Sequence, residues 1–236
     1  MKIILNSLEL KKELKKVKNL GFVPTMGSIH KGHEYLIEKS KKKCKKTLVS
    51  IFVNPTQFNN KKDFNNYPKN IKKDLFILNK LKVDYVFIPK VNDVYSFKRK
   101  KKIQLNKSDL ILCAKYRKGH FEGVLDIMDR FTKLVSPKKI FMGEKDFQQY
   151  YLVKKFLKYK YKVKIVICNT VRSANNVALS SRNLLLNKKD LLLVAKIIKE
   201  IIKLKKISLN KNKVGPLLLL KKKDLIKKYK INIEYL

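Results

Sequence analysis

Apolar and polar positions along the first 170 residues fall into blocks that predict strands separated by helices. Short, dense apolar runs are typical of strands that are covered on both faces. They occur at Phe22–Pro24, Thr47–Val53, Asp84–Ile88, Lys139–Met142 and Val163–Cys168. Apolar residues at helical spacing lie between them, over His33–Lys43, Tyr67–Lys80, His120–Val135 and Phe147–Tyr159. This alternation predicts an α/β fold built on a parallel sheet.

The pattern changes after about Asn169. Two lysine-rich helical segments follow, Lys188–Lys206 and Leu217–Tyr229, with a polar connection over Ile207–Gly215 between them and a short strand pattern at Ile231–Tyr235. We therefore expect a first domain over residues 1–169 and a small α+β domain over residues 170–236.

The charge is extreme, but it does not indicate a specific nucleic-acid site. The formal net charge is +40, and only five of the 58 basic residues are arginine. Base readout and two-pronged phosphate contacts favour arginine. The lysines are spread over the whole chain, including a run at Phe97–Lys102 that reads as a loop, and asparagine and isoleucine are also abundant. This composition indicates a general drift toward these residues, with non-specific polyanion binding at low salt as a side effect.

Membrane insertion and secretion are not expected either. No apolar run approaches the roughly 18–20 residues that span a bilayer. Cys44, Cys113 and Cys168 are far apart and odd in number, and each lies in or beside an apolar segment. Buried thiols in a reducing compartment fit this pattern best, so we expect a cytoplasmic protein.

His30 and His33 lie three residues apart where a helix is predicted to begin, just after a strand and a glycine turn. A helix N-terminus offers unpaired N–H groups and a partial positive charge, which suit phosphate, and imidazoles can donate hydrogen bonds to it. Two exposed histidines at a helix start are the plain alternative. A zinc site fits less well, because the chain has neither His-Glu-x-x-His nor Cys-x-x-Cys.

Other polar groups follow later strands, where parallel sheets bind ligands. Asn54 and Gln57 are amides suited to hydroxyl and carboxylate groups. Lys145 could neutralise a phosphate, and Asp146 could cap a helix or hold a ribose hydroxyl. The hydroxyls and guanidinium of Ser180–Arg182 also suit nucleotide phosphates. Taken one at a time, each of these motifs could instead be a turn or a helix cap with no role in binding.

Five motifs in this order resemble the pantoate–β-alanine ligase (pantothenate synthetase) family. They are Pro24–His33, Val49–Phe58, Arg117 with Gly119–Gly123, Gly143–Gln149 and Ala178–Asn183. The resemblance implies a Rossmann-like sheet of the nucleotidyltransferase type with the histidine–glycine (HIGH) signature, followed by a lid domain. The first domain would bind the nucleotide and pantoate.

The resemblance also implies a reaction, in which ATP and Mg²⁺ are used to join pantoate and β-alanine. Pantoate's carboxylate attacks the α-phosphorus, giving pantoyl adenylate and pyrophosphate. The amine of β-alanine then displaces AMP and forms pantothenate, a precursor of coenzyme A. A homodimer is expected.

Residue roles follow from the matched positions. His33, the family's proton donor, would act with other groups on the reacting phosphate: His30, Lys145, Ser180, Ser181 and Arg182. The matched ATP contacts are Met26, Gly27, Ser28, Ile29, His30, Lys31, Gly32, His33, Gly143, Glu144, Lys145, Asp146, Val171, Leu179, Ser180, Ser181 and Arg182. Gln57 and Gln149 match pantoate contacts, and Gln57 also lies near the β-alanine position. Asn54 is expected to help, and Asp74 is a candidate carboxylate on the Mg²⁺ side.

Two departures from the family stand out. The segment Ser173–Val177 lacks the acidic residue and glycine that usually precede Ala178, and the chain stops at Leu236, where the family continues with further strands. We therefore expect a shortened lid. The alternative function is a nonenzymatic relative that retains nucleotide binding, and pantoate-dependent pyrophosphate exchange would separate the two.

Overall fold

The computed structural model describes residues 1–96, 101–204 and 214–236. The chain divides into two compact units. The first comprises Met1–Val171 with Leu179–Ser181, and the second comprises Arg172–Ala178 with Arg182–Leu236. The loop expected over Phe97–Lys102 and the connection expected over Ile207–Gly215 lie largely outside the described residues.

A six-stranded, all-parallel sheet forms the centre of the first unit, in the order β1-β4-β3-β2-β5-β6. The strands are β1 (Lys2–Ile4), β2 (Leu20–Thr25), β3 (Lys46–Ile51), β4 (Tyr85–Phe87), β5 (Lys139–Gly143) and β6 (Lys164–Cys168). The prediction of a parallel α/β sheet is confirmed. Strand β1 was not predicted, because it is only three residues long with two of them exposed and so carries no clear apolar pattern.

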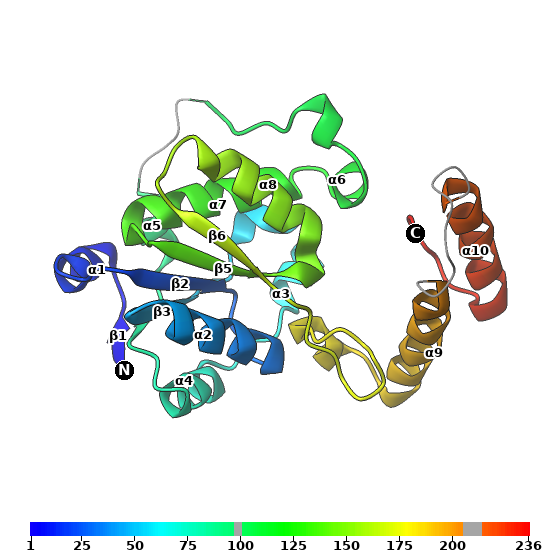
Figure 1. Cartoon of the computed structure of the whole chain (residues 1–236), viewed down its shortest axis with the longest axis horizontal. Coiled ribbons are helices and arrows are strands. Elements are labelled where there is room, and N and C mark those ends of the chain that lie inside the picture. The colour runs from blue at the N-terminus through cyan, green and yellow to red at the C-terminus, as the bar shows by residue number, and fades with distance from the viewer. Residues whose placement is uncertain (97–100, 205–213) are drawn as a thin grey trace. The chain divides into compact units, whose positions relative to one another are not determined.

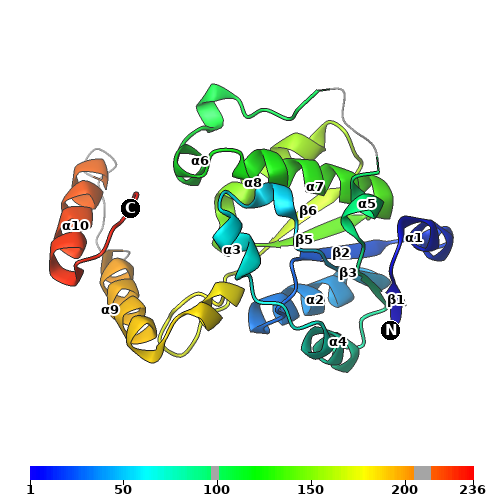
Figure 2. The same cartoon turned by 180° about the vertical axis from the view of Figure 1, so that it is seen from behind.

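Helices cover both faces of this sheet (Figures 1 and 2), with α7 and α8 on one side and α2 and α4 on the other. The helices of the first unit are α1 (Ser7–Leu14), α2 (Lys31–Lys43), α3 (Lys61–Asn65), α4 (Ile71–Lys80), α5 (Val91–Val94), α6 (Cys113–Tyr116), α7 (His120–Val135) and α8 (Phe147–Lys158). The short 3₁₀ turns of this unit are η1 (Pro55–Gln57), η2 (Lys107–Asp109) and η3 (Glu144–Asp146). A fourth, η4 (Ser181–Leu185), begins at the last residue of the first unit and continues in the second.

Successive strand residues face opposite helical layers. Phe22 and Leu48 belong to the apolar cluster that contains α7 and α8, whereas Val23 and Val49 belong to the cluster that contains α2 and α4. Side chains in a strand alternate between faces, so a strand buried on both faces must be apolar at every position. This is why the strands read as continuous apolar runs in the sequence.

One helix start differs from the expectation. The helix expected from Tyr67, with Pro68 in its first turn, begins instead at Ile71. Asn70 provides the cap, because its side-chain oxygen accepts the Lys73 N–H at 3.0 Å. A side-chain acceptor satisfies one of the N–H groups that a helix start leaves unpaired, and it therefore fixes where the helix begins.

The second unit contains helices α9 (Lys188–Leu204) and α10 (Val214–Tyr229). Glu200 on α9 pairs with Lys221 and Lys228 on α10 at 2.9 and 2.7 Å. The prediction of a strand at Ile231–Tyr235 is wrong, since these residues form no regular secondary structure. A lone strand needs a neighbour, and the described part of this unit has no strand for it to pair with. Among the described residues, no helix has the length and apolar character required to cross a bilayer.

Candidate functional site

His30 caps the N-terminus of α2 with its own ring. It lies in extended backbone, and its Nδ1 accepts the Gly32 N–H at 3.0 Å. Because Nδ1 is an acceptor here, the proton of the neutral ring lies on Nε2. A Cβ at position 32 would lie 2.8 Å from His30 Cε1, so the glycine makes room for the ring. The sequence identified the helix start but missed that His30 is the cap.

His33 lies against His30, with the ring centroids 4.1 Å apart. Burial lowers the pKa of His33 to about 3, with further contributions from His30 and Lys145. Burial, then Lys145, also lowers the pKa of His30. Both rings are therefore neutral at neutral pH in the ligand-free protein. The buried Nδ1 of His33 has no hydrogen-bond partner in the described part of the chain.

Lys145 approaches this pair from the neighbouring strand. It lies in η3, directly after β5, and β5 is the neighbour of β2, which leads to His30. Its ammonium group pairs with the Asp146 carboxylate at 2.7 Å. Asp146 precedes α8 but makes no side-chain capping bond, so the cap that the sequence suggested is absent there. Two imidazoles and an ammonium group thus gather at the carboxyl edge of the sheet, where the rings can donate hydrogen bonds to a phosphate and the ammonium group can neutralise its charge.

Asp74 on α4 holds the loop that leads from β2 to His30. Its Oδ2 accepts the Ser28 N–H at 2.8 Å, and its Oδ1 accepts the Ile29 N–H at 2.7 Å. The side chain is 2% exposed. Burial raises the pKa of Asp74, while the two backbone N–H bonds oppose this rise.

Asp74 does not fit as a direct Mg²⁺ ligand. Mg²⁺ keeps several waters and needs ligand oxygens with room around them. Both carboxylate oxygens of Asp74 already accept backbone N–H groups in a buried setting. Within residues 1–96, 101–204 and 214–236, no group of three His, Cys, Asp or Glu side chains is placed to hold a metal ion.

Part of the Ala178–Asn183 motif meets the same loop. Ser181 is buried, and its hydroxyl donates to the Ser28 carbonyl at 3.1 Å. The Leu179 N–H donates to the Val171 carbonyl at 3.0 Å. Ser180 is partly buried, and Arg182 belongs to the second unit. The structure therefore brings Ser181 to the histidine loop.

Asn54 fixes the amide of Gln57. Asn54 is 1% exposed, and its Nδ2 donates to Gln57 Oε1 at 3.2 Å and to the Gly123 carbonyl at 3.3 Å. Its Oδ1 accepts the Tyr95 hydroxyl at 2.7 Å. Since Gln57 Oε1 is an acceptor, Nε2 remains the donor, and it lies 2.8 Å from Met26 Sδ. Asn54 is thus enclosed by protein, and Gln57 presents an N–H group at the end of the histidine loop.

The Gly119–Gly123 motif packs against the turn that carries Gln57. His120 Nδ1 lies 2.6 Å from the Gln57 carbonyl oxygen. A Cβ at Gly123 would lie 2.3 Å from the Thr56 carbonyl oxygen, so only glycine allows α7 to approach this turn. The sequence showed this motif without a role, and it gave no signal for Tyr95, which is 41 positions from Asn54. Gln149 lies in the first turn of α8.

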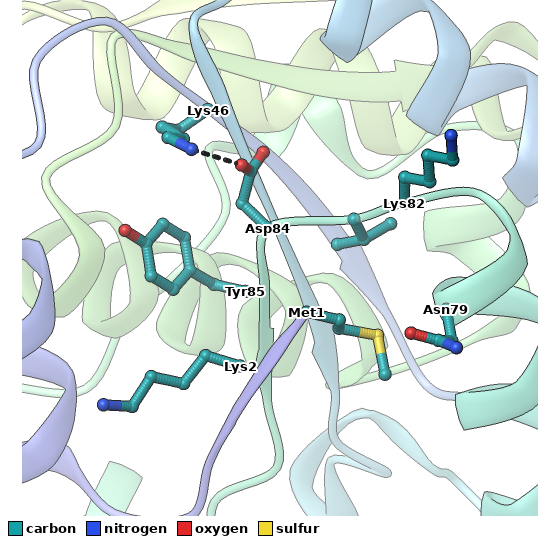
Figure 3. Close-up of a pocket in the computed structure, with 8 residues that line it drawn as sticks. Met1, Lys2, Lys46, Asn79, Lys82, Asp84 and Tyr85 are labelled. Carbon is teal, nitrogen blue, oxygen red and sulfur yellow. Dashed lines mark hydrogen bonds and ion pairs between the residues drawn. The ribbon is translucent and has the colours of Figure 1, made fainter.

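A separate pocket lies at the opposite edge of the sheet (Figure 3). It is lined by the amino-end residues of β1, β3 and β4 and by the end of α4: Met1, Lys2, Lys46, Asn79, Lys82, Val83, Asp84 and Tyr85. The ion pair between Lys46 and Asp84, at 2.7 Å, lies within it. Because the strands are parallel, this pocket is remote from His30 and is not part of the candidate site.

The family model for pantoate–β-alanine ligase matches residues 2–236, almost the whole chain. The chain belongs to the pantoate–β-alanine ligase family. The pantothenate synthetase of Pseudothermotoga lettingae is 40% identical over 184 residues, which are 76% of this chain and 66% of that protein. The pantothenate synthetase of Helicobacter pylori is 42% identical over 166 residues, 69% of this chain and 60% of that protein. The chain thus matches less than two thirds of the length of either relative.

Solved structures of this ligase family agree over more of the chain. The Francisella tularensis pantoate–β-alanine ligase, crystallised with β-γ ATP and β-alanine, has a TM-score of 0.86 and 34% identity, and the match covers 98% of this chain and 85% of that chain. The Thermus thermophilus pantothenate synthetase has a TM-score of 0.85 and 27% identity, covering 97% and 83%. The fold of the ligase is therefore shared along nearly the whole chain.

Proposed function

We propose that this protein joins pantoate to β-alanine at the expense of ATP, through a pantoyl adenylate, with release of pyrophosphate and AMP. Membership of the ligase family supports this reaction. The observation that carries it is the contact between Gln57 Nε2 and Met26 Sδ, at 2.8 Å. This contact joins the amide motif to the loop of His30 and His33, so a carboxylate held by Gln57 would lie beside a phosphate held by the histidines.

In the first step, a carboxylate oxygen of pantoate attacks the α-phosphorus, and the bond to the bridging oxygen breaks so that pyrophosphate leaves with the electron pair. Negative charge on the phosphoryl oxygens is met by the Nε2–H of His30, by His33 and by the Lys145 ammonium. Such preorganised donors and charges supply most of the catalysis in phosphoryl transfer. Because His33 is neutral in the ligand-free protein, we assign it a hydrogen-bonding role at the phosphate.

Gln57 orients pantoate. Asn54 holds Gln57 Oε1, so Nε2 donates to a pantoate oxygen. In the second step, the amine of β-alanine attacks the acyl carbon, AMP leaves, and the amine loses a proton to solvent. Mg²⁺ would enter with the ATP substrate and would supply further neutralisation of the phosphate charge. The contributions of Gln149, Ser180 and Arg182, the homodimer and the cytoplasmic location stay predictions.

The test is pantoate-dependent exchange of labelled pyrophosphate into ATP. The wild-type protein should catalyse exchange, Lys145→Ala should lower it by about 10²-fold, and Lys145→Arg should restore it in part, because a planar guanidinium differs from a point charge. Nucleotide binding without exchange in the wild type would instead support the nonenzymatic alternative. Full activity in both variants would remove Lys145 from the mechanism.

A further inference from the structure

We propose that Asp74 is a positioning residue that fixes the conformation of the loop Gly27–Ile29, which leads to His30. Its two carboxylate oxygens accept the consecutive N–H groups of Ser28 and Ile29, at 2.8 and 2.7 Å. A carboxylate matches two adjacent N–H groups with one acceptor each, and such charge-assisted bonds are stronger than neutral ones. The inference rests on the proposed function only for its kinetic consequences.

The loop has a shape that needs support. Gly27 and Ser28 both have positive φ angles, +80° and +52°. Left-handed backbone is disfavoured for a residue with a side chain, so Ser28 keeps this conformation only where its surroundings enforce it. A Cβ atom at position 27 would lie 2.9 Å from Asp74 Oδ2, so the carboxylate packs directly against the loop backbone.

Three elements of the candidate site depend on this loop. Met26 precedes it and contacts Gln57 Nε2. The Ser28 carbonyl accepts the Ser181 hydroxyl. His30 follows it and caps α2. A shift of Ser28 and Ile29 would therefore disturb the contacts of all three, although Asp74 itself is buried behind the loop.

The test is Asp74→Asn, which keeps the size of the side chain but leaves one acceptor and turns an NH₂ group toward a backbone N–H. Amide hydrogen exchange of Ser28 and Ile29 should quicken by about tenfold to a hundredfold, the range expected for losing a bond to a charged group. Exchange in the core of β3, at Leu48 and Val49, should be unchanged. The KM for ATP should rise by at least about tenfold, while the Mg²⁺ concentration for half-maximal activity stays the same.

The matched control is Asp84→Asn, at the opposite edge of the sheet. Asp84 also accepts a backbone N–H, that of Thr47 at 2.9 Å, and pairs with Lys46. This variant should lose comparable stability without a change in the exchange of Ser28 and Ile29 or in the KM for ATP. If Asp84→Asn changes these exchange rates and the KM for ATP as Asp74→Asn does, the effect is general destabilisation and the proposal is overturned.

Unchanged exchange at Ser28 and Ile29 in Asp74→Asn, with a shifted Mg²⁺ requirement, would assign Asp74 to the metal instead. If the wild type has no ligase activity, the proposed function fails, while the exchange rates still decide the role of Asp74. If Asp74→Asn does not fold, NMR of the wild type decides the role of Asp74. The measurement is the scalar coupling across each hydrogen bond, between the Asp74 carboxyl carbon and the backbone nitrogens of Ser28 and Ile29. Absence of these couplings would overturn the proposal.

Discussion

The His30 ring accepts the Gly32 N–H through Nδ1 at 3.0 Å, which leaves the ring proton on Nε2. Position 32 requires glycine because a Cβ there would lie 2.8 Å from Cε1 of the His30 ring. The spacing His-x-Gly-His is therefore a structural unit, in which one histidine caps the helix and its glycine permits the capping geometry. The cap sets which nitrogen of His30 can donate to a phosphate.

Gly32→Ala should displace the His30 ring and lower pyrophosphate exchange by about tenfold to a hundredfold, the scale of losing a positioned donor. The free energy of unfolding, measured with denaturant, should change much less, because alanine has a higher helix propensity than glycine. Gly215→Ala on α10 is the control, since a Cβ there meets nothing within 4 Å. Equal exchange rates in Gly32→Ala and the wild type would contradict the link between the glycine and the ring.

His33, which is half-buried and neutral in the folded protein, should make stability depend on pH. The unfolded chain protonates His33 near its ordinary pKa of 6.5, whereas the folded ring stays neutral down to about pH 3. The unfolded state then binds more protons between these values, so the free energy of unfolding falls as the pH falls through this window.

Denaturant unfolding of the wild type and of His33→Gln, compared at about pH 7.5 and about pH 5, measures this dependence. The variant should lose less stability on acidification than the wild type. His30, which contributes with the same sign, is present in both proteins. An identical loss in the two proteins would show that His33 is protonated in the folded state.

Gln57→Ala should raise the KM for pantoate far more than the KM for ATP, because a site built to hydrogen-bond a substrate loses a donor. Tyr95→Phe should act in the same direction and more weakly, since it removes only the hydroxyl that holds Asn54. Steady-state kinetics with each substrate varied in turn measures both effects. Equal changes for ATP and pantoate in Gln57→Ala would indicate a structural role.

The second unit should open before the first. Most apolar side chains of α9 and α10 are only partly buried or are exposed, and Leu225 is the only fully buried side chain that the structure describes in them. Segments with little buried apolar area have low local stability. Amide exchange over residues 188–204 and 214–229 should exceed that of the strand Lys46–Ile51. Equally slow exchange would mean that this unit is packed against a further surface, such as a second copy of the chain.

The sequence predicted the parallel sheet and placed the binding motifs at strand ends, because strand and helix periodicity are local. Two of its misses were also local in origin. The short β1 carried no pattern, and the cap at Asn70 overrode the proline at position 68. The strand expected at Ile231–Tyr235 failed since pairing depends on a partner that no local pattern reveals.

By itself, then, the sequence determined the kinds of residue at the site: two histidines, a lysine and amides beside a glycine turn. Only the tertiary structure decided what several of them do. Asp74 meets Ser28 across 46 positions, and Tyr95 meets Asn54 across 41. The physical reason is that hydrogen-bond geometry between distant segments is set by strand order and helix packing, and it leaves no trace in residue spacing.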